Sequence, residues 1–140
     1  PKETASAFVD GWYRTGDLGR RDETGLLYIP DRLKDMYISG GENVFPAEVE
    51  AVIATHPAVR DVAVIGIPDP RWGESGVAFV VPASPETLAE DILSHCAARL
   101  ATYKRPLRVI FLEAIPRTAS GKAQKHILRQ SHTDTDPKPF

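Results

Sequence analysis

Cysteine is nearly absent from this sequence of 140 residues, which contains only Cys96. A single cysteine excludes an internal disulfide framework and a cysteine-based metal cluster within these residues. It is compatible with a reducing compartment, and we expect a cytoplasmic protein. Histidine is also sparse, and no pair shows the HxxxH spacing of a metal site, so we predict no protein-bound metal ion. The histidines are His56, His95, His126 and His132.

A surplus of one charge is missing as well. The 17 basic and 19 acidic residues give a formal net charge of −2. Without a polybasic face, the sequence gives no reason to expect a nucleic-acid partner or an anionic membrane surface. No apolar run is long enough to span a bilayer, and no signal-peptide pattern opens the sequence. We therefore expect neither nucleic-acid binding nor a membrane span from these residues.

Methionine is represented only by Met36, and the chain begins at Pro1 in a helix-like segment. We therefore expect these residues to be part of a longer protein. A chain of this length suits one compact domain with a modest core.

Apolar patterning predicts a small domain of the α/β (α+β) class, with a central sheet of roughly three strands flanked by helices. Residues 62–67 and 77–81 are nearly continuous apolar runs, typical of strands covered on both faces. Residues 87–100 show the clearest helical stripe. The other expected elements are a helix from residue 46 to about 55, strands at 36–39 and 108–112, and a last helix capped by Ser120.

The two ends of the chain have a different character. Residues 1–31 predict a short helix and short strands with a hairpin turn at residues 22–25, which could not form a core alone. Residues 131–140 have no periodicity and almost no apolar side chain, so we expect them to be a disordered tail.

The charged stretch at residues 31–50 contains Gly40 and Gly41, followed by a helix that begins at Pro46. Adjacent glycines allow a backbone to lie close to a ligand, because no Cβ stands in the way. A charged turn, a glycine hairpin and a surface helix would give the same pattern without a ligand. The stretch therefore leaves both a binding loop and a plain hairpin open.

Two single residues could also carry chemistry. Asp17 lies in a glycine-flanked turn, where a carboxylate can cap its own backbone or accept hydrogen bonds from two vicinal ribose hydroxyls. Lys122 ends the loop at residues 116–121, where a lysine can be a solvated surface charge or can reach an anion outside its own domain. This loop is not a P-loop, because the spacing of its glycines is wrong.

Four motifs, in one order, carry a resemblance to a known family. They are YRTGDLG at residues 13–19, DRLKDMYISGGEN at 31–43, DPRWGE at 69–74 and PRTASGK at 116–122. Together they resemble the adenylate-forming superfamily of acyl-CoA synthetases, close to fatty-acid and benzoate-type CoA ligases. The resemblance covers residues 13–122.

This resemblance implies a division of the chain. Residues 1–31 would end the large amino-terminal AMP-binding domain, residues 32–130 would form the mobile carboxy-terminal domain, and residues 131–140 would be the tail. The implied partner is the enzyme's own amino-terminal domain. The implied reaction joins a carboxylic acid to ATP as an acyl-adenylate with release of diphosphate, after which CoA displaces AMP. Mg²⁺ would arrive with ATP and be held mainly by the missing domain. The fragment alone would be inactive, because the family's phosphate loop and acyl pocket are absent.

The resemblance also implies roles for single residues. Lys122 would contact the substrate carboxylate and the α-phosphate during adenylation. Asp17 would bind the ribose hydroxyls, and Arg32 the nucleotide, although Arg32 could instead pair with Asp31 or Asp35. Lys34 falls at the hinge about which the family rotates its carboxy-terminal domain between the two half-reactions.

The implied CoA-binding residues lie in three segments. Gly40 and Gly41 would leave room for the pantetheine arm. Trp72 would lie beside CoA, and Tyr103 and Arg105 would meet its nucleotide, since an aromatic face suits adenine and a guanidinium suits phosphate. Trp72 could instead simply close the end of the sheet.

Two departures from the family pattern stand out, and two other functions remain open. Pro30 and Asp31 stand where many members have a glycine, and Tyr37 replaces a small aliphatic residue after the hinge.

The alternative functions are a relative that loads a carrier protein or oxidises its adenylate, and a non-catalytic module with the same fold.

Overall fold

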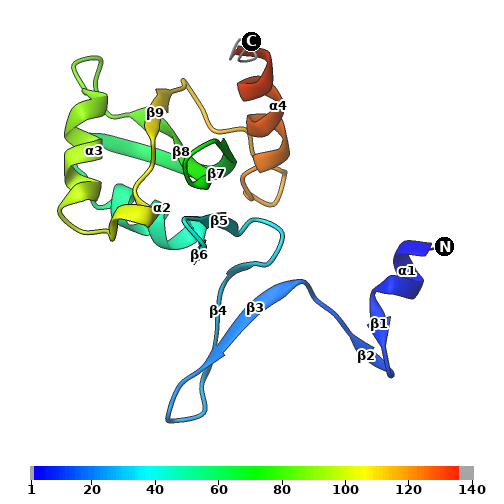
Figure 1. Ribbon diagram of the computed structural model, residues 1–140. Coiled ribbons are helices and arrows are strands. Elements are labelled where there is room, and N and C mark those ends of the chain that lie inside the picture. Colours follow the sequence, from blue (N-terminus) through cyan, green and yellow to red (C-terminus); the bar gives the residue numbers. More distant parts are fainter. Residues whose placement is uncertain (1, 136–140) are drawn as a thin grey trace.

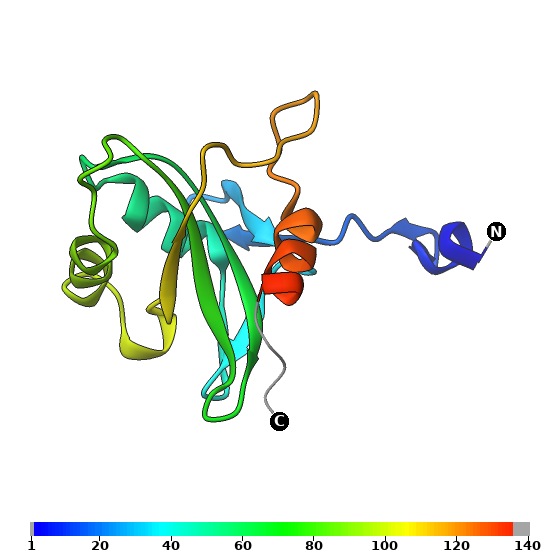
Figure 2. The same ribbon diagram turned by 90° about the horizontal axis from the view of Figure 1, so that it is seen from above.

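The computed structural model describes residues 2–135, with the side chains of residues 3, 30, 31 and 133–135 not described. The chain opens with an arm that extends away from the rest of the molecule (Figures 1 and 2). It contains α1 (Lys2–Ser6) and two antiparallel two-stranded sheets, formed by β1 (Phe8–Val9) with β2 (Trp12–Tyr13) and by β3 (Asp17–Arg21) with β4 (Leu27–Arg32). Many large apolar side chains of the arm are exposed, Trp12 at 79%. The arm has no core of its own, as predicted.

The main domain is built on one five-stranded sheet. Its path runs β6 (Glu42–Val44), β5 (Tyr37–Ser39), β8 (Gly73–Pro82) and β7 (Val59–Asp69), and β9 (Arg108–Phe111) pairs with β8 in parallel. The mixed α/β fold is confirmed, but the prediction of roughly three strands is too low. The two runs expected at 62–67 and 77–81 form one long antiparallel hairpin, β7–β8.

Helices cover both faces of this sheet (Figure 2). On one side, α2 (Pro46–Ala54) and α3 (Ala89–Ala97) pack against a cluster that includes Val64, Ala78 and Val80. On the other, α4 (Lys125–Thr135) packs against a cluster that includes Ala63, Ile65, Val77 and Phe79. Successive side chains of a strand point to opposite faces, so an uninterrupted apolar run is required where both faces are covered.

Tyr37 is buried in a slot made by two glycines. Gly66 and Gly76 face each other in the β7–β8 register. A Cβ added to Gly66 would overlap the Tyr37 Cβ, and one added to Gly76 would overlap the Tyr37 hydroxyl. Within the described structure this hydroxyl has no hydrogen-bond partner, and burial raises the pKa of Tyr37 well above its usual range. Tyr37, which replaces a small aliphatic residue of the family pattern, therefore fits because Gly66 and Gly76 have no side chains.

The carboxy-terminal end differs from the sequence-based expectation in two ways. Ser120 does not cap the last helix, since its hydroxyl lies 2.9 Å from the Thr118 hydroxyl inside a loop and α4 starts only at Lys125. The disordered tail expected at 131–140 is wrong for residues 131–135, which continue α4. Leu128 and His132 attach this helix to the sheet. Both are buried, and the His132 Nε2 lies 2.6 Å from the Arg108 guanidinium of β9. Residues 136–140 lie outside the described residues.

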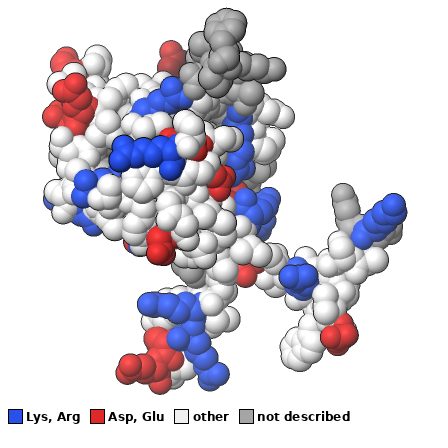
Figure 3. Space-filling view, in the orientation of Figure 1, with Lys and Arg blue, Asp and Glu red and all other residues white. Residues whose placement is uncertain are grey.

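No helix among the described residues is both long and apolar enough to cross a membrane. Lys and Arg are interspersed with Asp and Glu on the face shown in Figure 3.

Candidate functional site

Lys122 lies exposed at the end of a closed loop between β9 and α4, which projects beyond the sheet (orange in Figure 2). The Thr118 N–H donates to the Lys122 carbonyl at 2.8 Å, and the Lys122 N–H donates to the Thr118 hydroxyl at 3.1 Å. A further bond joins the Gly121 N–H to the Thr118 carbonyl at 2.9 Å. The backbone of Lys122 is thus held while its side chain faces solvent, which suits a cation that acts on a group outside its own domain.

Arg117 ties this loop to the sheet. Its Nε and one terminal nitrogen donate to the two carboxylate oxygens of Asp61, at 3.2 and 2.6 Å, and its other terminal nitrogen donates to the Gly121 carbonyl at 2.7 Å. Asp61 belongs to β7, so the loop that carries Lys122 is fixed to one end of the β7–β8 hairpin.

Asp17 and Arg32 come together in the arm. They are directly opposite each other in the β3–β4 pairing, and the Arg32 Nε lies 3.4 Å from an Asp17 carboxylate oxygen. The Thr15 hydroxyl accepts from the Asp17 N–H at 3.1 Å and so caps the turn at Asp17. Asp35, one of the alternative partners of Arg32, lies 3.6 Å from Arg129. The predicted nucleotide-binding pair therefore forms a single exposed unit.

Lys34 lies in the exposed turn between β4 and β5, through which the backbone passes from the arm to the main domain. The two parts also contact each other between β4 and α2. Two backbone bonds flank Lys34, from Leu33 to the Gly16 carbonyl at 2.8 Å and from Asp35 to the Arg32 carbonyl at 3.1 Å. Lys34 thus lies between the arm, which has no core of its own, and the main domain.

Gly40 and Gly41 form the turn of the β5–β6 hairpin, with φ values of 60° and 84°. Two successive positive φ angles are typical of a type I′ turn and favour glycine at both positions. A Cβ on Gly40 would lie 2.8 Å from the Trp72 ring, whereas a Cβ on Gly41 would meet no atom within 4 Å. The stretch is thus a tight β-hairpin, and its turn also has exposed backbone without side chains. The Trp72 indole packs against Gly40, and Gly41 has open space beside its Cα.

Trp72 lies in the β7–β8 turn, which is stabilised by hydrogen bonds to the Asp69 carboxylate. One carboxylate oxygen of Asp69 accepts the Arg71 and Trp72 N–H groups at 2.8 Å each, and the other accepts the Ser75 hydroxyl at 2.9 Å. These bonds, led by that from Trp72, hold the pKa of Asp69 below its usual range. The Trp72 carbonyl in turn accepts the Gly40 N–H at 2.8 Å.

Glu74 fastens the same region from the other side, since its carboxylate accepts the Ile38 N–H at 2.7 Å. Sequence reasoning did not single out Asp69 or Glu74, although both lie in the DPRWGE motif that carried the resemblance. The signal available was an aspartate at the start of a predicted turn, a position where its carboxylate commonly binds the following N–H groups.

Tyr103 and Arg105 lie beside this region. The 3₁₀ helix η1 (Thr102–Lys104) contacts β6 and β8. Tyr103 is half-buried against the core, and the Arg105 Nε donates to the Leu100 carbonyl at 3.0 Å. Among the described residues, no hydrogen bond, ion pair or ring contact joins Tyr103 or Arg105 to Trp72 or to the glycine turn.

The predicted residues thus fall into separate groups rather than one cluster. Lys122 is anchored through Asp61 near one end of β7, and Trp72 with Gly40 is anchored through Asp69 at the other end. Eight residues of extended strand place these anchors roughly 26 Å apart. The two groups are therefore anchored at opposite ends of β7.

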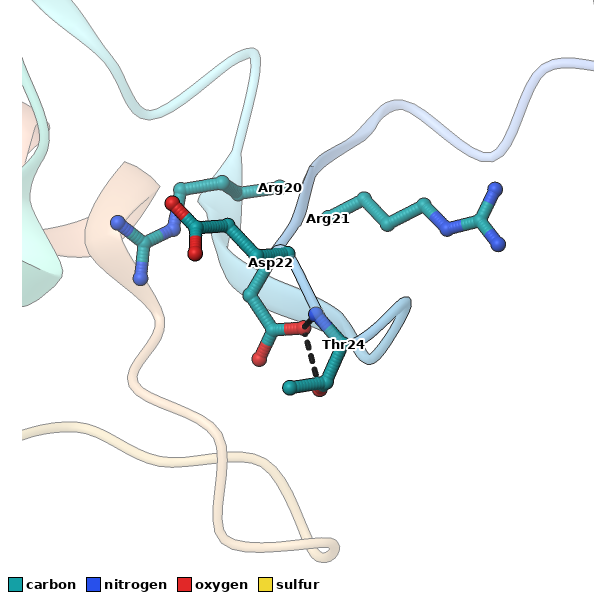
Figure 4. Close-up of a pocket in the computed structure, with 5 residues that line it drawn as sticks. Arg20, Arg21, Asp22 and Thr24 are labelled. Carbon is teal, nitrogen blue, oxygen red and sulfur yellow. Dashed lines mark hydrogen bonds between the residues drawn. The ribbon is translucent and has the colours of Figure 1, made fainter.

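A shallow pocket at the tip of the β3–β4 hairpin is a turn, not a ligand site. Arg20, Arg21 and the residues up to Thr24 line it, and the two arginine side chains point to opposite sides of the hairpin (Figure 4). Asp22, which also lines it, accepts the Thr24 N–H and hydroxyl at 2.9 and 2.7 Å and so stabilises the turn. The hydrogen bond from Thr24 is the leading cause that lowers the pKa of Asp22.

Comparison with known proteins identifies the family to which this chain is related. A family model described as the AMP-binding enzyme C-terminal domain matches residues 48–122. The long-chain-fatty-acid–CoA ligase FadD13 of Mycobacterium tuberculosis is 54% identical over 138 residues, which are 99% of this chain and 27% of that protein. A 2-succinylbenzoate–CoA ligase of Listeria monocytogenes is 49% identical over 133 residues, covering 94% of this chain and 28% of that protein.

Solved structures show the same relation. ATP-bound MatB from Rhodopseudomonas palustris superimposes with a TM-score of 0.88 at 41% identity, covering 96% of this chain and 27% of that one. The chain therefore spans little more than a quarter of the length of the relatives it matches. The family model covers more than half of the chain, and the resemblance drawn from the four motifs is confirmed: the chain belongs to the AMP-binding enzyme C-terminal domain family.

Proposed function

We propose that this chain is the mobile carboxy-terminal part of a cytoplasmic carboxylate–CoA ligase. The observation that carries the proposal is the separation of Lys122 from the Gly40 and Trp72 turn, at opposite ends of one hairpin. Two reactions that share one active site can each be served by a different end, provided that the domain turns between them.

In the first half-reaction, an oxygen of the acid's carboxylate attacks the α-phosphorus of ATP, and diphosphate leaves. Lys122 stabilises the negative charge that develops on the carboxylate and phosphate oxygens. The attraction between this preorganised cation and those oxygens becomes stronger as the charge develops in the transition state. Asp17 accepts hydrogen bonds from the ribose hydroxyls, and Arg32, already paired with it, donates to the nucleotide.

In the second half-reaction, the thiol sulfur of CoA attacks the acyl carbon and AMP leaves. A rotation about Lys34 withdraws Lys122 and brings the other end of the hairpin to the reacting atoms. The open side of Gly41 leaves space for the pantetheine arm, and the Trp72 indole forms a wall beside it. Tyr103 and Arg105 would meet the CoA nucleotide at the flank of this region.

Mg²⁺ would accompany ATP. The described residues of this chain contain no group of three or more His, Cys, Asp or Glu side chains that could hold a metal ion. The ion would be held by the amino-terminal domain, which would also supply the acid pocket. The present 140 residues should therefore not form acyl-CoA by themselves.

The experiment that tests this function uses the full-length protein with Lys122→Ala. We expect acyl-adenylate formation from acid and ATP to fall on the order of a hundredfold to a thousandfold, as for loss of one charge-stabilising group. Thioester formation from preformed acyl-adenylate and CoA should be largely kept. Lys125→Met is the matched control, because it removes a nearby lysine that pairs with Glu50 at 2.8 Å. Equal loss of both half-reactions in Lys122→Ala would contradict the alternating-end mechanism.

A further inference from the structure

The free edge of β7 is covered by two carboxylates. In the described structure β7 pairs with β8 only, and its other edge presents backbone N–H groups. The Val62 N–H donates to Asp61 at 2.9 Å, and the Val64 N–H donates to Glu50 at 2.8 Å. Covering such an edge is a common way to prevent pairing with another chain.

Each carboxylate also binds a cation from the segment that follows β9. Asp61 binds Arg117 through both oxygens, and Glu50 binds Lys125 at 2.8 Å. The two pairs differ in what the cation binds beyond the carboxylate. Lys125 ends at Glu50, whereas the Arg117 guanidinium continues to the Gly121 carbonyl at 2.7 Å.

The continuation matters because Gly121 directly precedes Lys122. A guanidinium is planar and rigid, so its two arms fix the Gly121 carbonyl relative to the Asp61 carboxylate. Asp61 is itself fixed to the sheet by the Val62 N–H. An uninterrupted series of hydrogen bonds therefore runs from β7 through Asp61 and Arg117 to the backbone beside Lys122.

We propose that Asp61 is a positioning residue for adenylation: through Arg117 it sets where Lys122 stands relative to the sheet. The inference rests on the proposed role of Lys122. Asp61 and Arg117 are both partly exposed, at 33% and 39% of their side-chain surface, and exposed pairs contribute little to stability. Their main effect is thus on the placement of the loop, not on whether the domain folds.

The test measures both half-reactions of the full-length protein for Asp61→Asn, Glu50→Gln, Lys122→Ala and the double variant Asp61→Asn with Lys122→Ala. Asparagine keeps an oxygen for the Val62 N–H but loses the charge that orients Arg117. We expect adenylation in Asp61→Asn to fall roughly tenfold to a hundredfold in kcat, the size of effect that a displacement of about 1 Å produces. Thioester formation from preformed acyl-adenylate should stay at the wild-type rate.

The double variant and the matched control make the result specific. If Asp61 acts only through Lys122, adding Asp61→Asn to Lys122→Ala should lower adenylation no further. Glu50→Gln removes the equivalent edge carboxylate and should leave both half-reactions unchanged. Arg117→Lys provides a second route should Asp61→Asn fold poorly, because lysine can reach Asp61 but cannot bridge to Gly121. It should show the same selective loss of adenylation.

Three outcomes would overturn the inference while leaving the proposed function intact. Asp61→Asn could adenylate at the wild-type rate while Lys122→Ala does not. Both half-reactions could fall together in Asp61→Asn, or Glu50→Gln could lose adenylation equally, and either would indicate a structural role. If Lys122→Ala itself adenylates normally, the proposed function fails first, and the inference fails with it.

Discussion

Replacing Gly40 by alanine should destabilise the domain far more than replacing its neighbour Gly41. Both glycines have a positive φ, at 60° and 84°, so alanine at either position costs about 1–2 kcal/mol of backbone strain. Only at Gly40 does the new Cβ meet another group, lying 2.8 and 3.0 Å from two carbons of the Trp72 ring. Relieving such overpacking typically costs a further 1–3 kcal/mol or so. We therefore expect a loss of about 1–2 kcal/mol for Gly41→Ala and about 2–5 kcal/mol for Gly40→Ala.

The assay is urea unfolding of the 140-residue chain followed by circular dichroism, which does not depend on tryptophan fluorescence. The same two substitutions are then made with Trp72→Ala. Without the indole, the two alanines should cost the same within about 0.5 kcal/mol, the usual scatter for uncoupled sites. The reasoning is refuted if Gly40→Ala and Gly41→Ala are equally destabilising while Trp72 is present. It is equally refuted if removing Trp72 leaves their difference unchanged.

Two further predictions concern stability. Tyr37→Phe removes a buried hydroxyl that has no hydrogen-bond partner in the described structure, so the free energy of unfolding should rise by about 1 kcal/mol and Tm by about 4 °C; a lower Tm in calorimetry would contradict this. Hydrogen bonds from Trp72 and Arg71 hold the pKa of Asp69 below its ordinary value of 3.8, so its stabilising effect is complete above that value and is lost as the pH falls through the folded-state pKa. Asp69→Asn should flatten the fall in stability as the pH drops below about 4, measured as urea midpoints, and parallel pH curves for the two proteins would count against it.

The core of the fold could be predicted because its signal is local. The apolar runs that form β7 and β8 and the stripe that forms α3 are each contained in a short segment. The helix at Pro46 was confirmed for the same reason, since proline fits the first turn. Strand β6 was left undecided between a hairpin strand and a loop, because three residues after a glycine pair carry too little pattern to separate the two.

The site was predictable at the level of motifs and not at the level of contacts. Asp17 and Arg32 were proposed separately, and only the β3–β4 register places them face to face. Asp61 and Arg117 are 56 positions apart in the sequence, so nothing local indicates that they pair. Ser120 illustrates the opposite error: a serine before an apolar stripe favours a helix cap, but here Thr118 engages the hydroxyl first.

The fit of Tyr37 between Gly66 and Gly76 has a consequence for building chimeras of this protein with its relatives. The ring and the two glycines that receive it depend on one another sterically, although they are far apart in the sequence. A crossover placed after Tyr37 and before Gly66 would take the ring from one parent and its slot from the other. If that second parent has any side chain at either glycine position, the hybrid core cannot close. Crossovers placed before Tyr37 or after Gly76 keep these residues together, so the turn at Lys34 is a safer junction than the loops between Tyr37 and Gly66.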